Sequence, residues 1–66
     1  MVRVLRDKTS GLYYKGSGEW TGRKEKAFVF ADLAAAMECS QHLQRSFLEL
    51  VLCFSGPGRD ISFPLK

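Results

Sequence analysis

The sequence lacks several features that mark common classes of protein. It has only two cysteines and two prolines in 66 residues, and its longest apolar run, residues 47–54, is interrupted by Glu49. That run is too short to span a bilayer, which takes about 20 apolar residues, and two cysteines do not make the disulfide framework of a small secreted domain. The N-terminus also lacks the apolar segment of a secretory signal. We therefore expect free thiols, no membrane association and a cytoplasmic location.

The composition that remains is typical of a folded domain. Aromatic residues make up 12% of the chain and charged residues 26%, which excludes the aromatic-poor, highly charged composition of disordered proteins. A chain of 66 residues has room for one core only. We expect a single small α+β domain over residues 1–66, too small for an active site of many parts.

Positive charge is concentrated in the first part of the chain. The formal net charge is +3, and residues 1–26 carry seven Lys and Arg against three Asp and Glu, whereas residues 27–66 carry three against four. Such a basic segment can attract nucleic acid or an acidic protein. The charge permits these partners without requiring one.

The hydrophobic pattern predicts five short strands and one helix. Residues 2–6, 12–15 and 27–30 have the alternation or β-prone composition of strands. Asp32 is a predicted N-cap, and the alanine-rich stretch after it predicts a helix of about 12 residues. Residues 47–54 and 61–63 complete the set, with a predicted turn at 55–58. The predicted fold is α+β, a single mainly antiparallel sheet in the order β-β-β-α-β-β packed on one α-helix.

The core is predicted between this helix and one face of the sheet. One side of the helix carries the stripe Leu33, Ala36, Met37, Ser40, Leu43 and Gln44. Of these, Leu33, Met37 and Leu43 are the core residues, and alternation along residues 47–54 places every second side chain on the same face. The strand residues assigned to this core are Leu48, Leu50, Leu52 and Phe54, together with Val2, Val4, Leu12 or Tyr14, Phe28, Phe30, Ile61 and Phe63.

The opposite face of the sheet is the first candidate site. One helix covers one side of a sheet, and the side left open carries apolar residues mixed with charged ones. An apolar stripe rimmed by charge is typical of a homodimer or partner surface, although single exposed Val and Leu residues are also normal in monomers. The predicted interaction face consists of Leu5, Tyr13, Val29, Val51 and Cys53.

A basic aromatic segment is the second candidate site. Aromatic rings stack on bases while Lys and Arg contact phosphates, so residues 13–26 have the composition of a nucleic-acid surface. The competing interpretation is a packed Trp and Tyr beside a solvated loop over residues 22–26. The predicted nucleic-acid contacts are Tyr14, Lys15, Trp20, Arg23, Lys24 and Lys26.

Two resemblances accompany this pattern. Over residues 1–45, Tyr14, Trp20, Phe30 and the alanine-rich helix resemble the DNA-reading domains of phage integrase arms and plant ethylene-response factors. That resemblance implies a sheet that enters the major groove. The wider pattern, residues 13–16, Trp20, residues 27–30 and the helix, is similar to a group of short uncharacterised bacterial proteins with a β-β-β-α-β core, and it implies no functional residues.

The residues offer little for catalysis or metal binding. Cys39, His42 and Cys53 are at most three ligands, one fewer than a structural zinc site needs, and His42 is the only histidine. The glycine pairs at 16–18 and 56–58 fit hairpin turns better than phosphate-binding loops. We expect no enzyme, no cofactor and no small-molecule substrate. The leading expectation is a non-enzymatic interaction module with a protein partner, itself or another, and nucleic-acid binding is the alternative.

Overall fold

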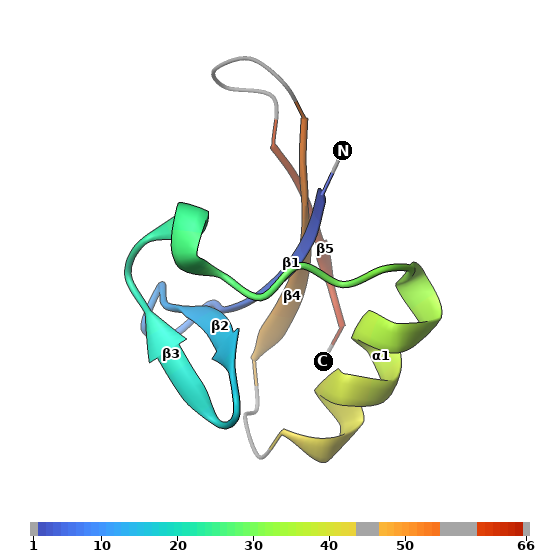
Figure 1. The fold of residues 1–66 in the computed structure, drawn as a ribbon, viewed down its shortest axis with the longest axis horizontal. Helices are drawn as coiled ribbons and strands as arrows, with labels where there is room; N and C mark the ends of the chain where they lie inside the picture. The colour runs from blue at the N-terminus through green and yellow to red at the C-terminus, as the bar shows by residue number, and fades with distance from the viewer. Residues whose placement is uncertain (1, 44–46, 55–59, 66) are drawn as a thin grey trace.

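The structure is a computed structural model, and it describes residues 2–43, 47–54 and 60–65. The elements are β1 (Val2–Asp7), β2 (Tyr13–Gly16), β3 (Glu19–Thr21), the 3-10 helix η1 (Lys24–Lys26), α1 (Leu33–His42), β4 (Leu48–Cys53) and β5 (Ile61–Pro64), as Figure 1 shows. The five strands form one antiparallel sheet in the order β3-β2-β1-β4-β5. The predicted α+β fold with one sheet and one α-helix is therefore confirmed.

The centre of the sheet is the pair β1 and β4. These strands align over their whole length, from Val2 opposite Cys53 to Asp7 opposite Leu48. The short strand β2 meets β1 only where Tyr13 lies opposite Arg6, whereas β5 follows β4 from Leu52 to Glu49. β1 and β4 are therefore the strands that can be covered on both faces of the sheet.

The predicted third strand, residues 27–30, was wrong. The third strand is Glu19–Thr21, which pairs with β2 across a turn that places Gly16, Ser17 and Gly18 at φ 105°, 54° and 76°. Residues 27–30 make an isolated bridge, in which the Phe30 N–H donates to the Arg3 carbonyl over 2.9 Å, and the Phe28 N–H donates to the Tyr14 carbonyl of β2 over 2.8 Å. They run beside the part of β1 that β2 is too short to reach. Their β-prone side chains pack against the sheet, but their backbone does not form a strand of it.

The helix begins where the sequence predicted. The Asp32 carboxylate accepts a hydrogen bond from the Ala35 N–H over 2.8 Å, which confirms the N-cap. Ala36 and Ser40 are the buried residues of α1, and small side chains there allow the helix to approach the sheet closely. Leu33 and Met37, predicted as core, remain 48% and 44% exposed.

The two faces of the sheet both bear apolar clusters, and the predicted orientation of β1 was wrong. On the side of α1, the buried cluster is Leu5, Phe30, Ala36 and Leu50. On the other side, Val4 packs with Val51 and Cys53, and Tyr13 and Ala27 lie against them. Figure 1 shows α1 and η1 on opposite sides of β1, β4 and β5. Both faces of β1 are apolar, so alternation alone could not say which one meets the helix.

Several predicted core residues lie at the surface. Because α1 contacts β1 and leaves β5 beside it open, the side chains at the margins of the sheet are only half covered. These residues, 39% to 48% exposed, are Val2, Phe28, Phe54, Ile61 and Phe63. The predicted turn at 55–58 lies outside the described residues. In the described part of the chain, no helix is long and apolar enough to cross a membrane.

Candidate interaction surface

The predicted interaction face does not form one open surface. Leu5 is fully buried on the side of α1, so it cannot share a face with the other four residues. Val51 and Cys53 are 1% and 9% exposed, and Tyr13 is partly buried against them. Val29 is the one residue of the five that is exposed, at 52%.

The segment that follows β3 covers this face. Ala27, directly after η1, packs on the cluster formed by Val4, Val51 and Cys53. Lys24 in η1 donates to the carboxylate of Asp60 over 2.6 Å, which ties the segment to the start of β5. The prediction counted one helix as the only available cover, and it did not foresee that residues 22–27 would fold back over the sheet.

A partly buried ion pair lies on the same face. The Arg6 Nε donates to the Glu49 carboxylate over 2.5 Å, and the Arg6 guanidinium carbon lies 5.8 Å from the centroid of the Tyr13 ring. Burial lowers the pKa of Arg6, but hydrogen bonds to Glu49 and Tyr13 and their charges outweigh it, so the pKa is raised. Glu49 is only 5% exposed, so this pair holds β1 to β4 rather than presenting a charge to a partner.

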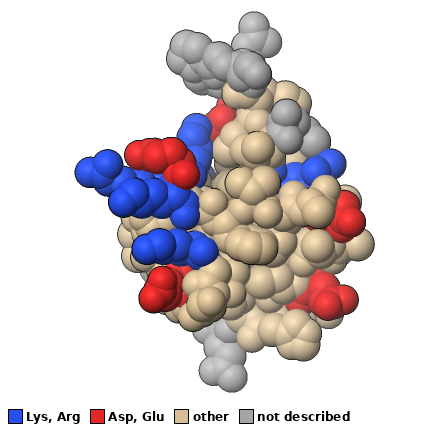
Figure 2. Space-filling view, viewed as in Figure 1, with Lys and Arg blue, Asp and Glu red and all other residues tan. Residues whose placement is uncertain are grey.

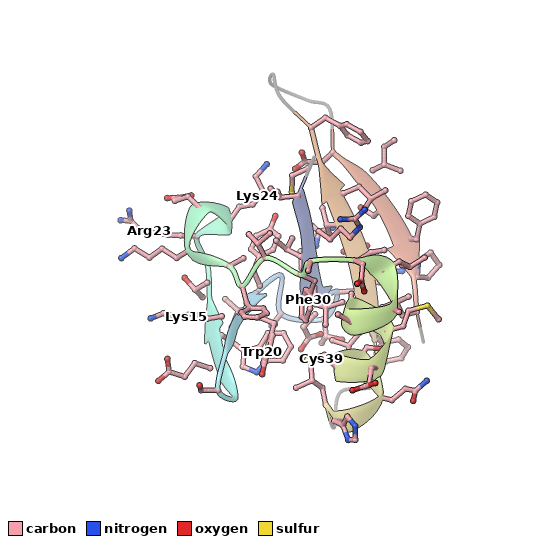
Figure 3. All side chains as sticks on the ribbon, turned by 45° about the vertical axis from the view of Figure 1, so that its right-hand side comes forward. Lys15, Trp20, Arg23, Lys24, Phe30 and Cys39 are labelled. Atoms are coloured by element: carbon pink, nitrogen blue, oxygen red, sulfur yellow. The ribbon has the colours of Figure 1, made fainter. Side chains whose placement is uncertain are left out.

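The predicted nucleic-acid cations do gather in one region. Figure 2 shows Lys and Arg side chains over η1 and the β2–β3 hairpin, and Figure 3 shows Lys15, Arg23 and Lys24 on the side away from α1. Carboxylates accompany most of these cations: Lys15 lies 3.9 Å from Glu19, Arg23 lies 3.9 Å from Glu25, and Lys24 pairs with Asp60. Of the four predicted cations, Lys26 alone has no carboxylate within 4.0 Å among the described residues.

The predicted base-stacking rings are part of an aromatic cluster. The Tyr14 ring stacks on the Phe30 ring with 6.4 Å between the ring centroids, and it meets the Trp20 ring edge-on with 5.5 Å between the centroids. Phe28 completes the cluster 4.8 Å from Phe30. Tyr14 and Trp20 are both partly buried, so their faces are largely occupied by protein neighbours.

An apolar groove lies between α1 and the β4–β5 side of the sheet, and the sequence did not predict it. The cavity has a volume of about 460 Å³. Its lining residues are Arg3, Leu33, Met37, Leu50, Leu52, Phe63 and Leu65. Arg3 is the one charged residue in this lining.

The groove has a wall and a floor of different origin. Leu33 and Met37, one helical turn apart on α1, form the wall beside the buried stripe of Ala36 and Ser40. Alternate residues of β4 and β5 form the floor, where Leu50 lies opposite Phe63 and Leu52 opposite Ile61. The wall residues Leu33 and Met37 and the floor residue Phe63 are 44–48% exposed, as is Ile61, which lies beside the floor on β5.

A signal for this groove was present in the helix sequence. The predicted apolar stripe contained Ala36 and Ser40 between larger residues, and a helix approaches a sheet most closely where its side chains are small. That closest approach turns Leu33 and Met37 to the margin of the contact. Leu33 and Met37 were assigned to the core because periodicity does not distinguish the centre of a contact from its edge.

The cysteines and the histidine were the sequence's candidates for metal binding. Cys39 and Cys53 are free, and no group of three His, Cys, Asp or Glu within this part of the chain could hold a metal ion. His42 is exposed at the end of α1. Burial raises the pKa of the Cys53 thiol, the charge of Asp60 adds to the rise, and Lys24 opposes it. A thiol held protonated in this way is a poor nucleophile.

Comparison with known proteins adds no functional information. No family model, no curated protein and no solved structure matches the chain. The apolar groove and the charged hairpin are therefore the two features from which function is inferred.

Proposed function

We propose that the protein is a non-enzymatic interaction module that associates with a second copy of itself through the apolar groove between α1 and β5. The observation that carries this proposal is a set of four half-exposed apolar side chains: Leu33, Met37 and Phe63 line the groove, and Ile61 lies beside it on β5, opposite Leu52. Contiguous apolar area of this kind marks interaction sites in soluble proteins.

A second copy suits the groove because the two halves of the surface complement each other. Leu33 and Met37 stand as a ridge on α1, and the floor beside them over β4 and β5 is uncovered. A twofold axis between two copies places each ridge on the floor of the other, so one surface serves as both partners. A partner of another sequence would have to supply a comparable apolar ridge.

The available area fits a reversible dimer. At 44–48% exposure, the four side chains present on the order of 300 Å² of apolar surface, taking roughly 150–200 Å² for a fully exposed side chain of this size. Two copies would remove about twice that, and with the polar rim the interface reaches roughly 1,000 Å², the lower limit for a specific complex. We expect association at micromolar or higher concentration.

Sedimentation equilibrium from low to high micromolar concentration tests the proposal. We expect a monomer–dimer equilibrium for the natural chain, and a monomer for Met37→Lys, because a buried ammonium group would be unpaired in the interface. Val29→Lys is the matched control: it introduces the same charge at an equally exposed apolar residue that does not line the groove. A natural chain that stays monomeric, or a dimer that Val29→Lys disrupts and Met37→Lys does not, would contradict the proposal.

Nucleic-acid binding through the hairpin is the second candidate. The gathering of cations over η1 and the β2–β3 hairpin favours it, whereas the carboxylates beside Lys15, Arg23 and Lys24 weaken the positive potential. Titration of the Trp20 fluorescence with single-stranded and duplex DNA and RNA at low salt is the test, because binding to phosphates is strongest there. Unchanged fluorescence and unchanged mobility in a gel would exclude this candidate.

A further inference from the structure

Arg3 gives the apolar groove one charged end. It lines the groove opposite Leu52, and its Nη1 donates to the Ala31 carbonyl over 3.2 Å, just before α1 begins. The guanidinium has four further N–H groups, and no ion pair of Arg3 occurs among the described residues. Asp32, which follows Ala31, uses its carboxylate to cap α1. A positive charge that can bind an anion therefore lies at one end of a lining that otherwise consists of Leu, Met and Phe side chains.

The floor of the groove extends from this charge along the strands. It begins at Leu52 and ends at Leu65, whose N–H donates to the Leu48 carbonyl over 2.9 Å. Leu48 and Leu52 are four residues apart on β4, so the floor is about 13 Å long. An extended alkyl chain of about ten carbons has this length, since each bond of about 1.5 Å advances the chain by about 1.3 Å. The cavity volume of about 460 Å³ also lies in the range of small-molecule sites, roughly 300–1,000 Å³.

We propose that the groove binds an amphiphilic carboxylate of the fatty-acid type, with its carboxylate on Arg3 and its alkyl chain along the floor toward Leu65. A guanidinium matches a carboxylate through two parallel N–H donors. The rest of the lining is apolar, so it suits a chain without further polar groups. A neutral amphiphile leaves Arg3 without a counter-charge, and a cationic one is repelled by it.

The amphiphile and a second copy of the protein compete for the same surface. This competition rests on the proposed self-association, in which Leu33 and Met37 of each copy pack on the floor of the other. An alkyl chain on that floor takes the place of these side chains, so a dimer forms only from two empty grooves. By mass action, an amphiphile at ten times its own dissociation constant raises the apparent dissociation constant of the dimer about a hundredfold. The ligand thereby regulates the association.

Titration of the monomer with decanoate tests the site itself. The protein is kept dilute enough to stay monomeric and the decanoate below its critical micelle concentration, and amide NMR shifts are followed. We expect one site per chain, with shifts at the groove and none at the β2–β3 hairpin. The affinity should rise roughly fivefold to tenfold for each two carbons from hexanoate to decanoate. The rise should level off beyond dodecanoate, because further carbons extend past Leu65. Decanol and decyltrimethylammonium should bind about tenfold more weakly or worse.

Arg3→Met tests the charged contact, and Lys26→Met is its matched control. Lys26 also has no carboxylate within 4.0 Å in the described part of the chain, but it lies in η1, outside the groove lining. Arg3→Met should weaken decanoate binding about tenfold or more and leave decanol binding unchanged, whereas Lys26→Met should change neither. If Arg3→Met does not fold, the comparison of decanoate with decanol on the natural chain still decides the contact.

The outcomes separate this inference from the proposed self-association. Equal affinity for decanoate and decanol, or shifts that lie outside the groove, would overturn the carboxylate site. Sedimentation with and without decanoate then tests the competition, and a natural dimer that saturating decanoate leaves intact would overturn it while the self-association stands. A natural chain that is monomeric without decanoate and binds it at the groove would overturn the self-association and support the site.

Discussion

The Asp32 carboxylate decides where α1 starts. It accepts from the Ala35 N–H, one of the amide groups that the first turn of a helix cannot satisfy internally. Asp32 is also a residue with extended backbone, as an N-cap requires. The contact is local and rests on residue type, which is why the sequence predicted it correctly.

Replacing this cap should destabilise the protein by a small, defined amount. We expect Asp32→Ala to lower the free energy of unfolding by about 1 kcal/mol, because it leaves the Ala35 amide without its acceptor. Urea denaturation followed by circular dichroism gives the value. Asp32→Asn retains an acceptor and should lose only a fraction of it, and equal losses in the two variants would show that the cap is unimportant.

Cys53 should make the stability depend on pH in the alkaline range. Burial, together with the charge of Asp60, raises the pKa of this thiol above its ordinary value of 9.0. The unfolded chain therefore loses the proton first, and ionisation favours the unfolded state. The contribution of the protonated thiol is complete below pH 9 and is lost as the pH rises through 9 toward the raised pKa of the folded state.

Denaturation at pH 8 and pH 10 measures this effect. We expect the free energy of unfolding to fall over that interval, and Cys53→Ala, although less stable at both values, to show a smaller fall. Cys39→Ala is the comparison, since Cys39 is less buried than Cys53. If the fall is the same in Cys53→Ala as in the natural chain, the thiol is not its cause.

At the level of elements, the helix and the sheet meet through the smallest side chains of α1. Ala36 is fully buried and packs in the same cluster as Leu5 and Leu50, while Leu33 and Met37 stand at the margin. The sequence predicted that this helix would exist and would cover one face. It could not predict which residues of the helix contact the sheet, because that depends on how closely the helix packs against the sheet.

A larger residue at the contact should push the two elements apart. We expect Ala36→Leu to destabilise the protein by roughly 1–3 kcal/mol, the usual cost of extra volume in a packed core. Ala35→Leu is the matched control, because Ala35 is exposed on the same helix and the substitution there should be nearly neutral. Chemical denaturation of the two variants makes the comparison, and equal stabilities would show that α1 is not tightly docked at Ala36.

Two segments have structures that hydrophobic pattern and composition could not predict. Residues 27–30 have the composition of a strand, yet they make one bridge to β1, because the space beside β1 is shared with the short strand β2. Residues 22–26 were predicted as a loop and instead contain η1, and with Ala27 they cover the face on which Val51 and Cys53 lie. Both outcomes depend on contacts distant in sequence, such as Lys24 with Asp60.

For the molecule as a whole, the sheet is covered unequally on its two faces. One face meets α1 over β1 and stays open over β5, and the other meets η1 and Ala27. The sequence correctly indicated that one helix cannot cover five strands, and that apolar surface would remain. It assigned that surface to the wrong face, because hydrophobic periodicity does not indicate on which side of the sheet the chain after β3 passes.

If the remaining surface binds a second copy, the stability of the whole molecule must depend on its concentration. A dimer that dissociates on unfolding is favoured by mass action, so the thermal midpoint should rise by a few degrees between about 5 and 500 µM chain. Met37→Lys should abolish this rise, because it removes the association without altering a buried residue of the monomer, in which Met37 is 44% exposed. Val29→Lys should keep it. Differential scanning calorimetry at several concentrations measures the midpoint, and a value independent of concentration in the natural chain would show that the groove between α1 and β5 is not a site of self-association.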